Sequence, residues 1–454
     1  MYETPSSTGF HLVLAAARAH DVPMRIARLL VGIGAACAAA HGVAADKAGS
    51  APQIVVAGTG DPNLDVAAVQ AAVNQGGAVL LRGHFSFDKP PTRRAPPQAF
   101  FPQMASVLVS KEVVISGVRD QRGEMTSING GIWPFAVEAP VAHVTIQGLR
   151  FVRPKAGAIE VNVVRGLAIA DCRVEGIEPI PSQDMAGAGV GIGIGISTTR
   201  KPPTPAQPGR PQDVSGDISI LNNYIDAVGG TASDLTVGIL VFSVGKSPDK
   251  AVDLYVSGNR ISNVTERAVN VRQLGGQAHI ERNVIVTGSV VGSGGGVGPE
   301  AIHVFGTGSY LVAHNSIQSG WATGAGIRVH GGFAGWPVTG AIVLDNDVNM
   351  PAPANSIFGA NSAGIEIRGF AEGNVVIGNR ISGRARAALA VMTREVGIPE
   401  NNQFVSNDLK NFLPSPAAVF VDKGVTNTLL VGKKCNVQDG GIGTVIVKLG
   451  GKDK

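Results

Sequence analysis

The chain has 454 residues, of which 44% are hydrophobic and only 16% are charged, and its formal net charge is +4. Such a hydrophobic chain is not intrinsically disordered, and a small net charge without basic runs argues against nucleic acid as a partner. The length would suit two or three ordinary domains, but the 61 glycines point to many short strands joined by tight bends.

The first predicted element along the chain is an export signal. Met24 begins a short basic stretch, Leu29–Ala40 is apolar, and small residues occupy the positions just before Asp46. Together these features describe a secretory signal peptide, and the apolar stretch is too short for a membrane-spanning helix. We therefore expect that translation starts at Met24 rather than Met1, that the signal peptide at 24–45 is removed, and that the protein is exported to the periplasm or secreted.

A short helix is predicted next, at Asp65–Val73. Its apolar residues lie on one helical face: Val66, Val69 and Val73. Two glycines at positions 76 and 77 end the helix, and Val79–Leu81 begins the first strand. We expect this helix to cover one end of a stacked structure, because a stack of repeats needs caps where its core is open.

Internal repeats dominate the rest of the chain. Seven asparagines, 24 to 36 residues apart, are each followed two positions later by a branched apolar residue: Asn223, Asn259, Asn283, Asn315, Asn346, Asn379 and Asn407. A second series pairs a small residue with an apolar one: Gly238–Ile239, Ala268–Val269, Ala301–Ile302, Gly326–Ile327, Gly364–Ile365, Ala388–Leu389 and Ala418–Val419. Repeats of this length are typical of solenoids, propellers and arrays.

The pattern within each repeat indicates the kind of solenoid. Short runs such as Ile327–His330 alternate apolar and polar residues, which indicates half-buried strands. Helical periodicity is absent, and the repeats hold too little strand for propeller blades. Stacked strand coils remain, which is an all-β parallel β-helix. Asparagines at one fixed turn suit it, because side chains of successive coils can form a hydrogen-bonded ladder. The proline-rich run at 198–214 is predicted to be an exposed inserted loop.

The opening motif D-x-A-A-V-Q-A-A-V…G-G-A-V-L-L-R-G and the recurring G-I-x-V and N-x-I steps resemble the pectin-lyase-like parallel β-helix proteins. The resemblance covers about Asp61 to Val431 and implies a single-stranded, right-handed solenoid with a short N-terminal capping helix. That family includes polysaccharide lyases, uronate epimerases, glycoside hydrolases and proteins without catalysis. We divide the chain into 1–45 (upstream extension and signal peptide), 46–143 (cap and first coils), 144–431 (β-helix) and 432–454 (closing coil and tail).

Outward-facing positions of the coils predict a polar patch on one sheet. If coils align on their inward apolar residues, the patch has two lines: His303, Arg328 and Glu366 in one, and Arg272, Phe305, His330 and Arg368 in the other. Neighbouring strands lie about 4.8 Å apart, so these side chains come within reach of one another. Trp321 and Trp336 flank the His330 strand, and such rings suit stacking against sugars at a wet edge.

This patch suggests chemistry on uronic acids. A uronate lyase or epimerase needs a base for the proton beside the carboxylate and positive groups for the enolate that forms. The candidate catalytic residues are His303, Arg328 and His330, and the candidate substrate-binding residues are Arg272, Glu366, Arg368, Trp321 and Trp336. The alternative is an ordinary solvated strand face on which Arg328 and Glu366 form an ion pair.

The preferred interpretation is an exported β-helix protein that acts on an acidic, uronate-containing polysaccharide by β-elimination or epimerisation. The alternative is a non-catalytic carbohydrate-binding or cell-surface structural protein, so whether the chain is an enzyme stays open. No cluster of Cys, His or Asp has the spacing of a zinc or calcium site, and neither a metal nor a cofactor is expected. The sequence does not decide between a monomer and a trimer.

Overall fold

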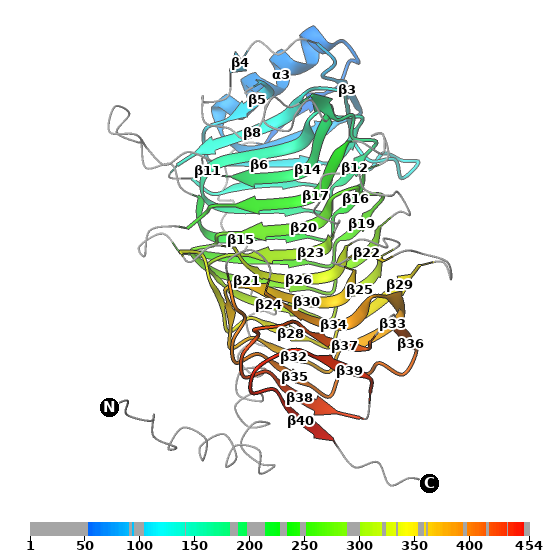
Figure 1. Ribbon diagram of the computed structural model, residues 1–454. Helices are drawn as coiled ribbons and strands as arrows, with labels where there is room; N and C mark the ends of the chain where they lie inside the picture. The colour runs from blue at the N-terminus through cyan, green and yellow to red at the C-terminus, as the bar shows by residue number, and fades with distance from the viewer. Residues whose placement is uncertain are drawn as a thin grey trace. The chain divides into compact units, whose positions relative to one another are not determined.

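The computed structural model describes residues 53–89, 93–94, 104–140, 142–181, 189–197, 214–227, 234–245, 251–287, 300–319, 324–332, 335–352, 358–359, 362–393, 397–414, 417–433 and 435–448. The compact unit to which they belong extends from Gln53 to Lys454 (Figure 1). The predicted signal peptide, the insertion at 198–214 apart from Val214, and Trp321 lie outside the described residues.

This unit is a stack of coils, and each coil contributes strands to three faces (Figure 1). A typical coil runs through β20 (Arg267–Arg272) on face 1, β21 (Gly276–Glu281) on face 2 and β22 (Val284–Thr287) on face 3. The chain then returns to face 1 at β23 (Glu300–Phe305), which pairs in parallel with β20. Faces 1 and 2 together form a 27-stranded sheet among the described residues, and face 3 is an 11-stranded sheet.

The remaining strands continue these three faces. Face 1 also contains β5 (Met104–Val109), β8 (Trp133–Ala139), the first half of β11 (Gly157–Ala170), β14 (Gly189–Ser197), β17 (Leu235–Phe242), β26 (Ala325–Gly331), β30 (Ala363–Gly369), β34 (Ala387–Met392), β37 (Val419–Val421) and β39 (Val437–Asp439). Face 2 also contains β1 (Ile54–Ala57), β2 (Gly77–Arg82), β6 (Val113–Gly117), β9 (Val144–Gln147), the second half of β11, β15 (Val214–Leu221), β18 (Val252–Ser257), β24 (Ser309–Ala313), β28 (Ile342–Leu344), β32 (Val375–Ile377), β35 (Gln403–Val405), β38 (Leu429–Gly432) and β40 (Val445–Lys448). Face 3 also contains β3 (His84–Ser86), β7 (Ser127–Asn129), β10 (Arg150–Val152), β12 (Arg173–Glu175), β16 (Tyr224–Asp226), β19 (Arg260–Ser262), β25 (Ser316–Ser319), β29 (Asp347–Pro351), β33 (Arg380–Ala385) and β36 (Phe412–Pro414). The short strands outside these faces or at their margin are β4 (Arg93–Arg94), β13 (Ile180–Pro181), β27 (Val338–Thr339) and β31 (Ala371–Glu372).

The inward side chains of the three faces form one continuous hydrophobic core of mainly valine, isoleucine, leucine and alanine. Parallel pairing of equivalent strands from coil to coil confirms the fold predicted from the repeats, an all-β parallel β-helix with a short helix at its N-terminal end. The resemblance to pectin-lyase-like proteins is therefore confirmed at the level of the fold.

The predicted asparagine ladder is present at the turn between faces 2 and 3. Asn259 donates from its backbone N–H and from Nδ2 to Oδ1 of Asn283, both at 3.0 Å, and Nδ2 also donates to the carbonyl of Ile220 at 2.9 Å. The ladder has the members Asn223, Asn259, Asn283, Asn315, Asn346, Asn379 and Asn407. Each rung therefore satisfies backbone groups that a tight turn would otherwise leave buried without partners.

Cys172 occupies the ladder position one coil before Asn223 and is buried. Its backbone N–H donates to Oδ1 of Asn223 at 2.9 Å. A second, shorter ladder was not predicted: Nδ2 of Asn374 donates to Oδ1 of Asn402 at 2.8 Å. With only two members, it has too little repetition to be recognised in the sequence.

The small-plus-apolar step of each coil is a bend on face 1 where two consecutive side chains point into the core. Ala301 and Ile302 both belong to the hydrophobic core, although neighbours on a regular strand point to opposite sides. The bend acts like a β-bulge, because it shifts the inward–outward alternation by one residue. The first position must be small: a Cβ added to Gly326 would lie 2.5 Å from Cγ1 of Val348.

Helix α3 (Pro62–Gln75) covers the first coils and extends the predicted helix by a few residues at each end. Asp61 caps its N-terminus by accepting a hydrogen bond from the N–H of Asn63. The three predicted apolar residues are buried: Val66, Val69 and Val73. Gln70 pairs its amide with both backbone groups of Leu108, at 2.8 and 2.9 Å. The helix thus covers the core, and Gln70 also pairs with backbone groups of β5 beyond the two residues that pair with β4.

Candidate functional site

The predicted polar patch lies on the outer side of face 1. The register places His303 opposite Arg328, and Arg328 opposite Glu366. The second line has the predicted order as well: Arg272, Phe305, His330 and Arg368. The alignment from which the patch was predicted is therefore confirmed.

Two charged residues that sequence analysis did not assign to the patch also belong to it. Glu300 and Arg267 precede the bend at the small residue, and the bend turns the next two side chains inward. Consequently, Glu300 lies on the same outer side as His303, and Arg267 lies opposite Glu300 on the preceding strand. The signal that could have placed them is the bend itself, which a strict alternation of inward and outward residues does not reproduce.

These side chains form an ion network of alternating charge across β20, β23, β26 and β30. Oε2 of Glu300 accepts a hydrogen bond from Nε of Arg267 at 2.7 Å, and Oε1 accepts one from Nη1 of Arg328. Arg328 also donates from Nε and Nη2 to Oε2 of Glu366, at 3.1 and 2.8 Å. Nη1 of Arg368 lies 3.8 Å from Oε1 of Glu366. The expected pair between Arg328 and Glu366 exists, but both side chains are buried rather than solvated.

An aromatic cluster adjoins the ion network. The rings of His303 and His330 are nearly parallel, with centroids 5.7 Å apart, and the edge of Phe305 meets His330 at 4.7 Å. The guanidinium of Arg272 lies 4.5 Å from the centroid of Phe305, a cation–π distance. Trp336, which sequence analysis proposed as a sugar-stacking residue, lies 6.2 Å from Phe305.

The arginines give this cluster a positive electrostatic potential. Burial and the nearby Arg267, Arg272 and Arg368 hold the pKa of His303 well below its usual range. Burial and the same field lower the pKa of His330 to about 2. Both imidazoles are therefore neutral at physiological pH, and neither ring nitrogen of His303 has a hydrogen-bond partner within the described part of the chain.

Access to the cluster is confined to one margin. His303 is 2% exposed and His330 is 8% exposed, whereas Trp336 is 40% exposed and Arg272 is partly exposed. The guanidinium of Arg272 lies between the rings of Phe242 and Phe305, at 5.6 and 4.5 Å. Among the described residues, this margin joins the cluster to solvent.

Apolar side chains border the cluster on the outer side of face 1. Towards the N-terminal end they include Trp133, Ile192, Val237 and Leu240, and towards the C-terminal end Ala390, Met392 and Phe420. Glu160 lies within the first of these patches, on β11 between β8 and β14, and is also buried. Burial, with the nearby Glu138 as a second cause, raises the pKa of Glu160 to about 8. Glu160 could not be singled out from the sequence, because nothing in the repeat distinguishes it from a solvated strand residue.

The structure thus brings the predicted site residues together, apart from one that is not among the described residues. The structure gathers His303, Arg328, His330, Arg272, Glu366, Arg368 and Trp336 around one cluster. Trp321 falls outside the described residues. The roles assigned to these residues remain predictions.

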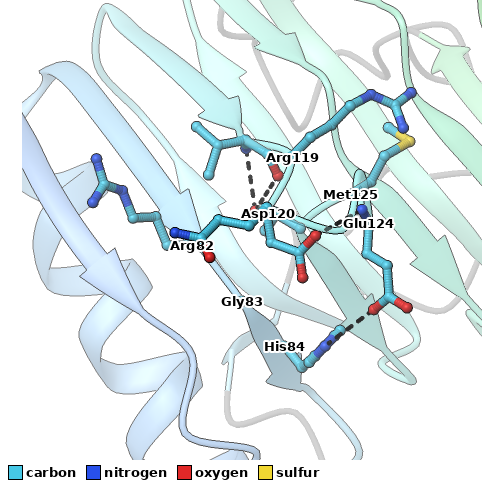
Figure 2. A pocket seen from close by; sticks show the side chains of 10 residues that line it. Arg82, Gly83, His84, Arg119, Asp120, Glu124 and Met125 are labelled. Atoms are coloured by element: carbon cyan, nitrogen blue, oxygen red, sulfur yellow. Dashed lines mark hydrogen bonds and ion pairs between the residues drawn. The ribbon is translucent and has the colours of Figure 1, made fainter.

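A separate pocket of about 410 Å³ lies near the first coils and is distinct from the cluster on face 1 (Figure 2). It is lined by Arg82, His84, Arg119, Asp120 and Glu124, among others. His84 and Glu124 point towards each other, with Nε2 and Oε2 3.9 Å apart, and both side chains are largely exposed (Figure 2). Charges of both signs in water contribute little binding energy, so this pocket is a weaker candidate than the buried cluster.

Within the described residues, no helix has the length and apolar character needed to cross a membrane. The same residues contain no group of three or more Cys, His, Asp or Glu that could hold a metal ion.

Comparison with known proteins yields structural matches only. No family model and no curated protein matches the chain. The mannuronan C-5 epimerase AlgE4 A-module of Azotobacter vinelandii matches at 12% identity over 79% of this chain and 93% of its own, with a TM-score of 0.39. DFA-IIIase of Arthrobacter chlorophenolicus A6 matches at 13% identity over 85% and 93%, also with a TM-score of 0.39. The Dettilon tailspike protein matches at 13% identity over 87% and 68%, with a TM-score of 0.33. Similarity this low does not extend to function, which has to be inferred from the residues of the chain itself.

Proposed function

We propose that this protein acts on an acidic, uronate-containing polysaccharide through the cluster on face 1, and that it does so outside the cytoplasm. The observation that carries the proposal is the position of His303. Its ring is neutral, its two nitrogens are without hydrogen-bond partners among the described residues, and it lies in the field of several guanidiniums. A neutral imidazole is a proton acceptor, and a positive field favours an anionic ligand such as a sugar carboxylate.

The field also suits the charge that develops during the reaction. Removing the proton beside a uronate carboxylate puts negative charge on the carboxylate oxygens, and fixed positive groups stabilise that charge in a site shielded from water. Arg272 and Arg368 are the guanidiniums on the second line: Arg368 lies opposite His330, and Arg272 lies opposite Phe305, which separates it from His330. We propose that these two guanidiniums bind the carboxylate of the uronate substrate.

Arg328 receives a different role in this proposal. Its guanidinium is held by Glu300 on one side and Glu366 on the other, and its side chain is 1% exposed. It is therefore a positioning residue, which fixes β23, β26 and β30 relative to one another next to His303. Glu366 acts with it in the same way.

The position of the histidines favours β-elimination over epimerisation. Both rings lie on one sheet face, 5.7 Å apart, so both reach the same side of a bound sugar. In β-elimination, one imidazole takes the C5 proton, the C5–H electron pair forms the C4–C5 double bond, and the bond from C4 to the glycosidic oxygen breaks. The imidazolium formed in this way then gives its proton to the leaving oxygen on the same side of the sugar, which returns the imidazole to its neutral form. Epimerisation would instead return a proton to the opposite side of C5.

The substrate would enter at the exposed margin. Trp336 offers a ring that is apolar with one polar tip, which suits stacking on a sugar face. From this margin, the carboxylate of a bound uronate would pass Arg272 before it meets His330.

A non-catalytic role is the second candidate. The ion network pairs the charges of Arg267, Glu300, Arg328 and Glu366 with one another in a buried setting. A closed network of this kind favours a structural role for these buried charges. Carbohydrate would then bind only at the margin around Arg272 and Trp336.

The test is to incubate the purified protein with a panel of acidic polysaccharides and to follow the ultraviolet absorbance of unsaturated uronate. We expect activity with at least one member, and its loss in His303→Gln and His330→Gln. His279→Gln, on the outer side of face 2, is the matched control and should retain it. Binding without cleavage by the wild type would instead support the second candidate.

A further inference from the structure

The C-terminal end of the stack exposes the type of side chain that the rest of the stack buries. In β40 and the turn before it, Ile442 is 65% exposed, Val445 43%, Ile446 46% and Val447 42%. In earlier coils, the corresponding strands of face 2 hold buried residues such as Val256. The last coil therefore has apolar surface that contributes nothing to stability while it faces water.

The interior of the stack also opens at this end. A cavity of about 670 Å³ is lined by core side chains of the last coils, including Phe404, Val419 and Leu430, together with Ile446 and Val447 of β40. In the part of the chain that the structure describes, β40 pairs with β38 alone, so the other edge of β40 presents its backbone groups without a strand partner. Such an edge is a template for pairing with another strand.

The N-terminal end of the same stack carries a helix. Helix α3 buries Val66, Val69 and Val73 against the first coils, and the Gln70 amide pairs with the backbone of Leu108 in β5. The two ends are therefore not alike: β1 at the N-terminal end also has one strand partner, β2, but its coils are packed against α3, whereas no helix packs against β40 among the described residues.

We propose that two copies of this chain associate through their C-terminal ends, with β40 of one copy pairing antiparallel with β40 of the other. The same patch on both partners makes a two-fold symmetric contact. Because both copies use this same patch in the contact, it closes as a dimer and does not propagate into a fibre. This inference is independent of the proposed activity, whose cluster lies on earlier strands of face 1.

The sequence of β40 fits such self-pairing. An antiparallel pair centred between Ile446 and Val447 places Ile446 opposite Val447 of the second copy, and Val445 opposite its Lys448. The two lysines are thus at opposite ends of the paired strands and do not face each other, so no like charges oppose across the ladder. The apolar pairs at the centre would cover the open cavity.

The test is the molar mass of the full chain in solution, measured by size-exclusion chromatography with light scattering over a wide range of concentration. We expect a mass twice that of one chain for the wild type, and a shift to the monomer for Ile446→Lys. Val284→Lys, a matched change of an exposed valine on face 3, should remain dimeric. Thermal unfolding of the diluted monomers verifies that Ile446→Lys is folded, since its side chain is exposed in a single copy.

Two outcomes would overturn the proposal. The first is a wild type that is monomeric at every concentration. The second is a dimer whose dissociation is unchanged in Ile446→Lys, which would mean that another surface holds it.

Discussion

At the residue scale, the charge of Arg328 is the feature with the largest expected effect on stability. Its guanidinium is buried between Glu300 and Glu366. We expect Arg328→Met to cost about 3–5 kcal/mol, because it leaves buried carboxylates with one cation fewer. Urea unfolding followed by circular dichroism measures this cost.

Two further variants test the cause of that cost. Arg328→Met combined with Glu366→Gln removes one charge of each sign and should recover part of the lost stability. Arg380→Met breaks an exposed pair with Asp347 and should cost about 1 kcal/mol or less. Equal losses of unfolding free energy in Arg328→Met and Arg380→Met would show that burial of the ion network does not increase the cost of removing an arginine.

Glu160 gives a pH dependence of stability with a definite sign. Its folded-state pKa of about 8 lies above its ordinary value of 4.5, so the native state holds the proton more tightly than the unfolded state does. The contribution of this group is complete below pH 4.5 and is lost as the pH rises towards 8, by up to about 1.4 kcal/mol per pH unit.

We expect Glu160→Gln to flatten the pH dependence of the unfolding free energy over this window, because glutamine mimics the protonated carboxyl. Denaturant titrations at several pH values measure it. Glu124→Gln, at an exposed position, should leave the slope unchanged. A slope that persists in Glu160→Gln would assign the dependence to another group.

The low pKa values of the histidines predict the pH profile of the proposed activity. Since the ordinary pKa of His330 is 6.5 and its value here is about 2, the imidazole stays neutral as the solution becomes mildly acidic. We expect kcat/KM for polysaccharide cleavage to stay level from neutral pH down through 6.5, because kcat/KM reports groups of the free enzyme. A half-maximal rate at pH 6.5 would contradict this and would indicate a solvated histidine.

At the scale of elements, the asparagine ladder holds the turn between faces 2 and 3. Asn283 accepts from Asn259 and donates to Asn315, so it is an interior rung, whereas Asn407 is the last and is only partly buried. We expect Asn283→Ala to cost about 1–3 kcal/mol, since it leaves buried donors without partners. Asn407→Ala should cost less in the same thermal and urea unfolding measurements. Equal costs would mean that the rungs do not depend on their neighbours.

Periodic features were the ones that could be predicted from the sequence. The ladder and the two lines of outward residues each repeat over several successive coils, so the alignment of one coil can be checked against the next. Glu300 and Arg267 were missed because the bend at Ala301 changes the alternation within a single strand. The burial of Arg328 was missed because the sequence of a strand does not reveal what covers its outer side.

At the scale of the whole molecule, the outer side of face 1 divides into three zones. Apolar residues around Trp133 and around Phe420 lie on either side of the charged cluster. The coils beneath them share one core, so the backbone is nearly uniform while the outer side chains change. Function on such a scaffold depends on which few coils carry polar residues, not on a change of fold.

The N-terminal end of the stack, which α3 covers, is also the end that the ribosome makes first. Helix α3 and its first coil can come together while later residues are still being synthesised, and each new coil then finds a finished edge to add to. Assembly in this direction does not need contacts between residues far apart in the chain, because the strands of each coil pair with those of the coil made just before it. The unpaired strand edge therefore moves to each new coil as it is made, and among the described residues of face 2 it remains at β40.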